Sequence, residues 1–165
     1  MASTSHYMLK RDTKESKRLD FQHEFMRALC HGNILHPSIP RDDIRAVADM
    51  GTGTGMWLND LAEELQVHGK HETKVDLIGF YISAEQFSSS DDRCPEVDLV
   101  AHDIISPFPK QYHGKFDVVN MRFLVYALNE ADLKKAIDNI TETLRKGSSR
   151  LIILLLVILT LASFY

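Results

Sequence analysis

A glycine-rich loop is the clearest candidate for chemistry in this sequence. Residues 49–55 read Asp-Met-Gly-Thr-Gly-Thr-Gly, between an apolar run at 45–50 and a segment with helical spacing at 56–67. Glycines let the chain turn sharply and let a ligand approach the backbone closely. The helix that follows presents unpaired N–H groups and the positive end of its dipole. A plain tight turn would explain the glycines alone, but the acid and the flanking elements favour a cofactor-binding loop.

The spacing of the glycines separates two classes of cofactor. Gly51, Gly53 and Gly55 form GxGxG, whereas the dinucleotide fingerprint is GxGxxG with an acid about 20 residues further on. The third glycine comes one residue too early for that fingerprint, and the ribose acid is missing from its expected place. The pattern favours S-adenosylmethionine, with its amino acid end at the loop, over a nicotinamide dinucleotide.

The elements that would position this loop alternate along the chain. Segments with helical spacing lie at 15–30, 56–67 and 129–147, and a short helix is expected at 84–87. Near-continuous apolar runs predict strands at 45–50, 74–82, 97–104, 116–121 and from 151 onward. Gly32 and Gly147 are expected to end the first and last helices, and Asn129 to begin the last one. This alternation predicts an α/β fold with a parallel sheet covered on both faces.

Composition excludes several other classes of protein. The chain has 165 residues, 44% of them hydrophobic and 25% charged, with a net charge of -4. This is ordinary for a single globular domain, and no basic patch suggests a nucleic-acid partner. Two cysteines without CxxC spacing predict neither a disulfide framework nor a zinc site, so no metal is expected. The polar N-terminus is no secretory signal, which favours the cytoplasm.

Five segments carry a more specific signal. They read YxLxxDxxExxRLxxQH at 7–23, VADMGTGTGMWLNDLAEEL at 47–65, VDLVAHDI at 97–104, FDVVNMRFL at 116–124 and LRKG at 144–147. Together they resemble the fungal LaeA-like methyltransferases of secondary-metabolite gene clusters. The resemblance covers about residues 7–147. It implies the seven-stranded, Rossmann-like class I fold, S-adenosylmethionine as cofactor and a small-molecule acceptor.

The resemblance also implies roles for single residues. The methionine end of the cofactor would be lined by four residues of the loop: Asp49, Gly51, Gly53 and Gly55. Asp103, closing the third strand, would accept a hydrogen bond from the adenine amine, with Ile104 packing near the ring. A turn-capping role is the alternative for Asp103. Asn120, near the end of the fourth strand, would point into the cofactor cleft.

An N-terminal helical lid is the other part that the resemblance implies. Residues 1–44 would form this lid, in front of a partial cofactor domain at 45–150. Tyr7, Arg18 and Gln22 would reach the cofactor from it, although Arg18 is equally well explained as a solvated surface charge. His23 is a candidate general base, but a surface position is favoured for it.

One departure from the family concerns the ribose of the cofactor. Family members usually carry an acid at the end of the second strand, in a GFDIS-like context. Residues 79–83 read GFYIS here, so Tyr81 stands at the ribose position. A single hydroxyl cannot chelate both ribose hydroxyls. Asp76 lies at the opposite end of the same strand and cannot replace the acid.

A second departure lies at the C-terminus. The family's Arg-Pro-Gly-Gly turn reads RKGS at 145–148, and residues 151–165 are uncharged. The family's last strands and substrate-binding segments would then be absent, so the sheet is expected to be incomplete, as in a truncated product. Fifteen apolar residues fall short of the roughly 20 that a membrane-spanning helix needs. A buried strand with an apolar tail is favoured; membrane association through 151–165 and oligomerisation through an exposed sheet edge stay open.

The functional expectation is a methyltransferase that acts on a small-molecule secondary metabolite with S-adenosylmethionine. Two alternatives stay open. One is a truncated or non-catalytic protein with the same fold, and the activity of the chain as given is doubtful. The other is an enzyme of this fold that uses the cofactor as a structural cation, without methyl transfer. The acceptor and the atom that is methylated do not follow from the sequence.

Overall fold

The computed structural model describes residues 13–68, 74–124, 127–147 and 150–154. Three α-helices are present in this part of the chain: α1 (Thr13–Leu29), α2 (Met56–His68) and α3 (Glu130–Thr143). The strands are β1 (Ala46–Met50), β2 (Asp76–Tyr81), β3 (Val97–Ala101), β4 (Val118–Arg122) and β5 (Arg150–Leu154). Three single-turn 3₁₀ helices, η1 (Ala84–Gln86), η2 (Ser90–Asp92) and η3 (Lys110–Tyr112), lie in the connections.

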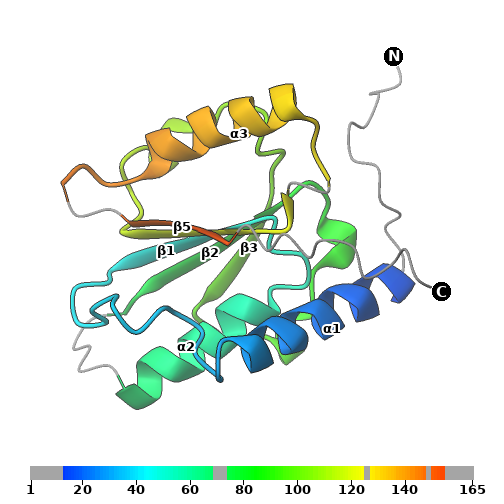
Figure 1. Ribbon diagram of the computed structural model, residues 1–165, viewed down its shortest axis with the longest axis vertical. Coiled ribbons are helices and arrows are strands. Elements are labelled where there is room, and N and C mark those ends of the chain that lie inside the picture. Colours follow the sequence, from blue (N-terminus) through cyan, green and yellow to red (C-terminus); the bar gives the residue numbers. More distant parts are fainter. Residues whose placement is uncertain (1–12, 69–73, 125–126, 148–149, 155–165) are drawn as a thin grey trace.

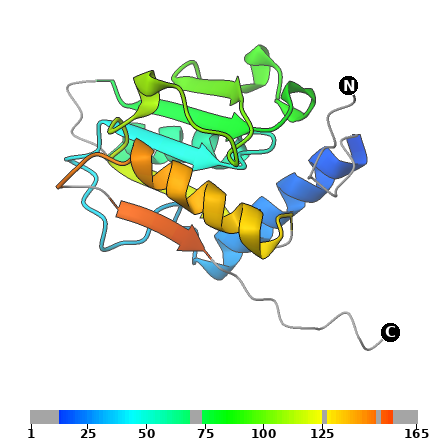
Figure 2. The same ribbon diagram turned by 90° about the horizontal axis from the view of Figure 1, so that it is seen from above.

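The strands form one parallel sheet in the order β3-β2-β1-β4-β5. The chain proceeds outward from β1 to β2 and β3, and then returns to place β4 on the other side of β1. This reversal leaves a crevice at the carboxyl ends of β1 and β4, which is where open α/β sheets bind ligands. β5 is the edge strand on the β4 side of the described sheet (Figure 2).

Helices cover both faces of the sheet, as the apolar strands predict. α1 and α2 lie on one face and α3 on the other (Figure 1). The core between α2 and the sheet includes Leu58, Leu61 and Val47, and the core under α3 includes Ala136 and Phe80. All five residues of β1 are buried. The core therefore holds β1 in place, and with it the start of the glycine loop that follows.

Local signals fixed most helix ends. Asn129 caps α3, and its side chain accepts a hydrogen bond from the Asp132 N–H at 2.9 Å. Gly32 follows α1 with a φ of +83° and donates to the Arg27 carbonyl at 2.8 Å, as a helix-ending glycine does. His31 also takes a positive φ, of +54°.

Three predicted boundaries are wrong, each because strand pairing or a turn overrides the local pattern. α3 ends at Thr143 rather than Gly147, because Leu144 is extended and pairs with Phe116. β3 stops at Ala101, before the predicted end at Ile104, because the chain turns at 103–106. β4 is shifted to 118–122 from the predicted 116–121.

The apolar run at the C-terminus is described only as far as residue 154. Its first residues form β5, so a strand begins there as expected. Residues 155–165 lie outside the described part, and with them the predicted tail. No helix among the described residues is both long and apolar enough to cross a membrane.

Candidate functional site

The glycine loop leaves β1 directly and is tied to the end of β2. The N–H groups of Gly51 and Thr52 donate to the Phe80 carbonyl at 2.9 and 3.0 Å. Gly51, Gly53 and Gly55 have φ values of +81°, +60° and +86°. L-residues with side chains rarely adopt this left-handed region. The backbone of the loop therefore requires glycine at all three positions.

The three glycines differ in what lies against them. Gly51 lines the cavity described next. A Cβ on Gly53 would lie 2.9 Å from Leu19 Cδ1 of α1, and a Cβ on Gly55 would lie 3.1 Å from both Leu99 methyl groups of β3. The structure thus brings Gly51 to the cavity wall, while Gly53 and Gly55 give room to neighbouring side chains.

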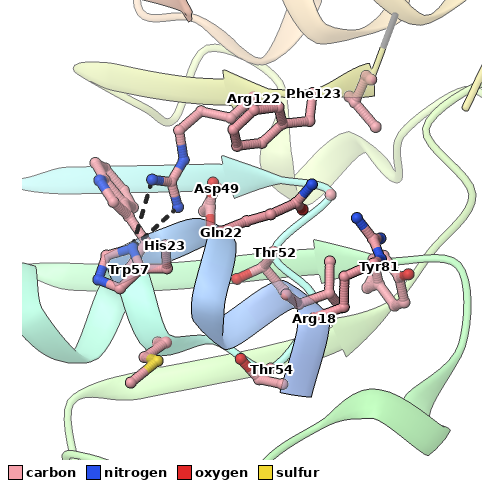
Figure 3. Close-up of a pocket in the computed structure, with 14 residues that line it drawn as sticks. Arg18, Gln22, His23, Asp49, Thr52, Thr54, Trp57, Tyr81, Arg122 and Phe123 are labelled. Atoms are coloured by element: carbon pink, nitrogen blue, oxygen red, sulfur yellow. Dashed lines mark hydrogen bonds between the residues drawn. The ribbon is translucent and has the colours of Figure 1, made fainter. Parts of the chain in front are cut away.

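A cavity of about 360 Å³ opens between α1, α2 and the carboxyl ends of β1, β2 and β4 (Figure 3). It lies at the crevice that the strand order predicts. Polar and apolar side chains share its wall: Arg18, Leu19, Gln22, His23, Asp49, Gly51, Thr52, Thr54, Met56, Trp57, Tyr81, Arg122, Phe123 and Leu124.

Asp49 is the carboxylate of this cavity. It is only 3% exposed, and Asn120 Nδ2 donates to its Oδ1 at 2.7 Å. The two residues are register partners on β1 and β4. Asn120 was expected to point into the cleft; the structure places its amide against Asp49 and on the wall of a second cavity.

Arg122, the last residue of β4, is a partly buried cation near this carboxylate. Burial raises the pKa of Asp49, and the positive charge of Arg122 and the Asn120 hydrogen bond counteract part of that rise. Burial likewise lowers the pKa of Arg122, against the attraction of Asp49. The two side chains form no direct ion pair in the described structure. Each of these charges would therefore gain from a ligand of opposite charge.

His23 connects Arg122 to α2. The Arg122 Nη1 and Nη2 atoms lie 3.4 Å from His23 Nδ1, and His23 Nε2 lies 2.9 Å from Asp60 Oδ2. A guanidinium only donates, so Nδ1 is assigned as the acceptor and the neutral ring donates from Nε2 to Asp60. His23 is 4% exposed. The predicted surface position is therefore wrong, because α1 packs against α2 at this point.

Polar contacts hold α1 across the glycine loop. Thr54 Oγ1 donates to Asp20 Oδ1 at 2.7 Å, and Arg27 Nη1 lies 3.1 Å from Asp60 Oδ2. Ser16 at the start of α1 adds a hydrogen bond to Gln86 beyond β2. Together with the packing of Leu19 on Gly53, these contacts place α1 as a cover over the loop.

Arg18 and Gln22 line the cavity from α1, as the lid interpretation expects. Arg18 lies at the rim, with its side chain 38% exposed. Its Nε and Nη2 atoms donate to Glu15 at 2.7 and 2.5 Å. Tyr7, the third residue assigned to the lid, lies outside the described residues.

A smaller hollow of about 30 Å³ lies on the other side of Gly51, toward the end of β3. Tyr81, Gly51 and Leu124 belong to the walls of both hollows. The rest of its wall is largely apolar: Phe80, Ile82, His102, Asp103, Ile104, Ile105 and Leu128. The structure thus brings Tyr81 to the same hollow as Asp103 and Ile104, which follow it more than 20 positions later in the sequence.

Tyr81 and Asp103 define the polar ends of this hollow. Tyr81 ends β2 and is 3% exposed. Asp103 caps its own turn, because its Oδ1 accepts from the Ile105 N–H at 3.2 Å. Asp103 Oδ2 makes no hydrogen bond within the described residues, so it is free to accept one from a ligand.

Two further residues of the site, Arg122 and Thr52, were not predicted from the sequence. Arg122 appeared only inside a motif, although a charge that directly follows a run of buried strand residues is itself a signal. Thr52 was not singled out; it lines the cavity, and its buried Oγ1 is a hydrogen-bonding group that lowers the pKa of Asp49 against the effect of burial. A Cβ on Gly79 would lie 2.7 Å from that Oγ1, so a glycine in β2 makes room for it.

Trp57 packs in the core and also belongs to the cavity wall. It is 3% exposed, and the Arg122 Cζ atom lies 5.7 Å from the centre of its ring. The indole therefore contacts the cation as well as the core under α2.

Comparison with known proteins gives one family for the chain. Residues 47–147 match the methyltransferase domain family. The methyltransferase grgD of a Penicillium species is 33% identical over 142 residues, which are 86% of this chain and 49% of that protein. The N-methyltransferase verN of Clonostachys rogersoniana is 27% identical over 86% of this chain and 47% of its own length. The chain thus spans about half the length of the curated relatives it matches.

Solved structures share the fold. The plantazolicin methyltransferase BpumL in complex with SAH superposes with a TM-score of 0.61 at 19% identity, over 85% of this chain and 51% of that one. The SAM-bound amino pentose methyltransferase CalS10 of Micromonospora echinaspora gives 0.52 at 20% identity, over 84% and 49%.

Proposed function

Because this chain belongs to the methyltransferase domain family, whose cofactor is S-adenosylmethionine, we propose that it binds this cofactor across the two hollows and serves methyl transfer to a small molecule. One observation carries the proposal. The buried Asp49 carboxylate, fixed by Asn120, faces the larger cavity beside Gly51 at the crevice of the sheet. A cationic amino group is the ligand that this carboxylate lacks.

The larger cavity fits the amino acid end of the cofactor. Asp49 would hold the ammonium group, with Thr52, which hydrogen-bonds to this carboxylate, beside it in the cavity wall. Arg18, at the rim, would lie near the carboxylate. Gly51 would bring bare backbone to the ligand, while Gly53 and Gly55 would support the loop by their packing.

The smaller hollow marks the place of the adenosine end, and its 30 Å³ would have to widen to admit a purine. Ile104 would pack on the adenine ring, and Asp103 Oδ2 would accept from its amine. Tyr81, in the wall that both hollows share, would face the ribose. With one hydroxyl it can hold only one of the two ribose oxygens well, so a weaker complex is expected than an acid at this position would give.

The residues of the site act by placement rather than by acid–base chemistry. When bound, the cofactor supplies an electrophilic methyl group on a sulfonium. Proximity and orientation alone can contribute about 7–11 kcal/mol to such a transfer. α1 forms one wall of the cavity. Both ring nitrogens of His23 are already engaged, so a role as general base for His23 is not supported by the geometry.

The finer assignment follows from the relatives. Both grgD and verN are fungal proteins, and verN is named an N-methyltransferase. We propose, on this basis and on the sequence resemblance, a LaeA-like enzyme of secondary metabolism with a nitrogen atom as the methyl acceptor. Residues 1–44 would then serve as its lid.

A non-catalytic protein of the same fold is the second candidate, and Tyr81 is the observation that favours it. A direct test is calorimetry of the 165-residue chain with S-adenosylmethionine and S-adenosylhomocysteine, followed by mass spectrometry of candidate fungal metabolites incubated with the protein. Binding with transfer supports the enzyme, and binding without transfer supports the second candidate. Absence of any binding would refute the enzyme and leave the non-catalytic protein.

A further inference from the structure

A second cavity, of about 320 Å³, lies behind a wall formed by His23, Trp57 and Arg122. These three side chains line both this cavity and the 360 Å³ cavity. The remaining wall comes mainly from the second half of α1 and the loop at 30–37. A molecule in the second cavity would therefore lie directly beside the amino acid end of a cofactor in the first.

Two arginines, Arg27 and Arg122, line the second cavity together with three histidines, and no Asp or Glu is among its described lining residues. Arg27 is paired with Asp60. Arg122 is therefore the cation that would attract an anion to this cavity.

Arg122 is the cation with the most unused hydrogen-bonding capacity. Its guanidinium has five N–H donors, yet in the described structure it makes two long contacts of 3.4 Å, both to His23 Nδ1. Arg27 differs, because it is paired with Asp60 at 3.1 Å. A carboxylate that accepts two parallel hydrogen bonds is the partner that suits a guanidinium best.

The rest of the wall is partly apolar. Met26, Ile34, Pro37 and the Trp57 indole supply the apolar part, and two amides, Asn33 and Asn120, are polar. A ligand that uses the whole space needs an apolar body beside its charged group.

We propose that the second cavity is the acceptor site and that it binds a small organic anion, an apolar body with one carboxylate, through Arg122. This inference rests on the proposed function, because it assigns the first cavity to the cofactor. The competing assignment gives Arg122 to the carboxylate of the cofactor itself, since Arg122 lines the first cavity too.

Trp57 provides the measurement. It is the only tryptophan of the chain and lies in the shared wall, so its fluorescence reports on both cavities. The 165-residue chain is saturated with S-adenosylhomocysteine and titrated with phenylacetate or with phenylacetamide, its neutral isostere. We expect phenylacetate to bind about tenfold more tightly or better, as hydrogen bonds between charged groups predict.

Three arginine variants test the assignment, each at an S-adenosylhomocysteine concentration that saturates that variant. In Arg122→Gln the preference for phenylacetate over phenylacetamide should disappear. Arg18 lines only the first cavity, so Arg18→Gln should weaken S-adenosylhomocysteine and keep the preference. Arg122→Lys keeps the charge without the planar fork and should retain part of the preference.

A measurement on the unchanged chain covers the case in which the Arg122 variants do not fold. Cys30 lines the second cavity, whereas Cys94 packs against the core near α2. Phenylacetate should slow alkylation of Cys30 by iodoacetamide, leave Cys94 unaffected, and act more strongly than phenylacetamide.

Three results would overturn the inference: equal affinity for the two probes, no protection of Cys30, or a preference for phenylacetate that survives unchanged in Arg122→Gln at saturating S-adenosylhomocysteine. Failure of the unchanged chain to bind S-adenosylhomocysteine would instead refute the proposed function.

Discussion

Asp49 and Asn120 are register partners on neighbouring parallel strands, and the Asn120 amide donates a 2.7 Å hydrogen bond to Asp49 Oδ1. The bond spans the crevice where the order of the strands reverses. It fixes one oxygen of a buried carboxylate and leaves its charge only partly compensated, by Arg122 without direct contact. A cationic ligand would therefore compensate the Asp49 charge. Without that ligand, the buried charge lowers the stability of the protein.

Asp49→Asn is expected to stabilise the chain near neutral pH and to weaken S-adenosylmethionine binding. Burial raises the pKa of Asp49 above its ordinary value of 3.8, so the folded chain binds this proton more tightly than the unfolded chain. The free energy of unfolding therefore falls as pH rises from about 4 through the raised pKa. Asparagine is neutral throughout and removes this fall.

Urea unfolding at pH 4.5 and 7.5 tests this expectation. The quantity compared is the free energy of unfolding of Asp49→Asn minus that of the unchanged chain at each pH. The stabilisation of Asp49→Asn should be larger at pH 7.5, and the exposed Asp98→Asn on β3 is the matched control. Cofactor affinity of the unchanged chain should rise over the same pH range, because the ammonium prefers the ionised carboxylate. A variant that is less stable than the unchanged chain at pH 7.5 would contradict the argument.

Gly53→Ala should displace α1 and weaken cofactor binding. The new Cβ would lie 2.9 Å from Leu19 Cδ1, in addition to the cost of a φ of +60°. Gly114 has nearly the same φ, +63°, with nothing within 4 Å of the new Cβ. Gly114→Ala therefore measures the backbone cost alone, about 1–2 kcal/mol.

Thermal or urea unfolding measures how much stability each glycine variant loses. The stability lost in Gly53→Ala beyond that lost in Gly114→Ala is the contribution of the contact with α1. Adding Leu19→Ala to Gly53→Ala should recover part of it. Equal losses in the two glycine variants would show that Leu19 moves aside freely.

Tyr81→Asp should tighten S-adenosylmethionine binding. A carboxylate can accept hydrogen bonds from both ribose hydroxyls, and such bonds to a charged group contribute about 1.5–3 kcal/mol, or roughly tenfold to hundredfold in affinity. Calorimetry on Tyr81→Asp, with the neutral Tyr81→Asn as control, tests this. Tighter binding in the asparagine variant than in the aspartate variant would place the ribose elsewhere.

Asp103→Asn should change which purine base the site prefers in the cofactor. Asparagine can still cap the turn, since its Oδ1 can accept from the Ile105 N–H as Asp103 Oδ1 does. Its amide nitrogen, however, would face the adenine amine as a second donor. The variant should lose about tenfold or more in affinity for S-adenosylhomocysteine.

S-inosylhomocysteine, in which a carbonyl replaces the amine, provides the comparison. Asp103→Asn should bind it better than the unchanged chain does, at unchanged thermal stability. An equal loss for both ligands would indicate that residue 103 only shapes the turn.

The sequence alone determined the framework of the site. Buried strands, helical spacing, the Asn129 cap and the GxGxG loop are local patterns, because each depends on residues a few positions apart. They placed β1, the loop and α2 correctly, and with them Asp49 and Gly51. Tyr81 was placed at the end of β2 by the same logic, and the structure puts it in the wall between the two hollows.

Only the tertiary structure decided what these residues contact. The helix α3 ends early because Leu144 pairs with Phe116, a partner 28 positions away in the numbering. His23 is buried because α1 packs on α2, and Arg122 becomes a cavity residue because β4 returns to the side of β1. Contacts between distant segments depend on how whole elements pack, and that packing minimises the free energy of the entire chain rather than of any local window.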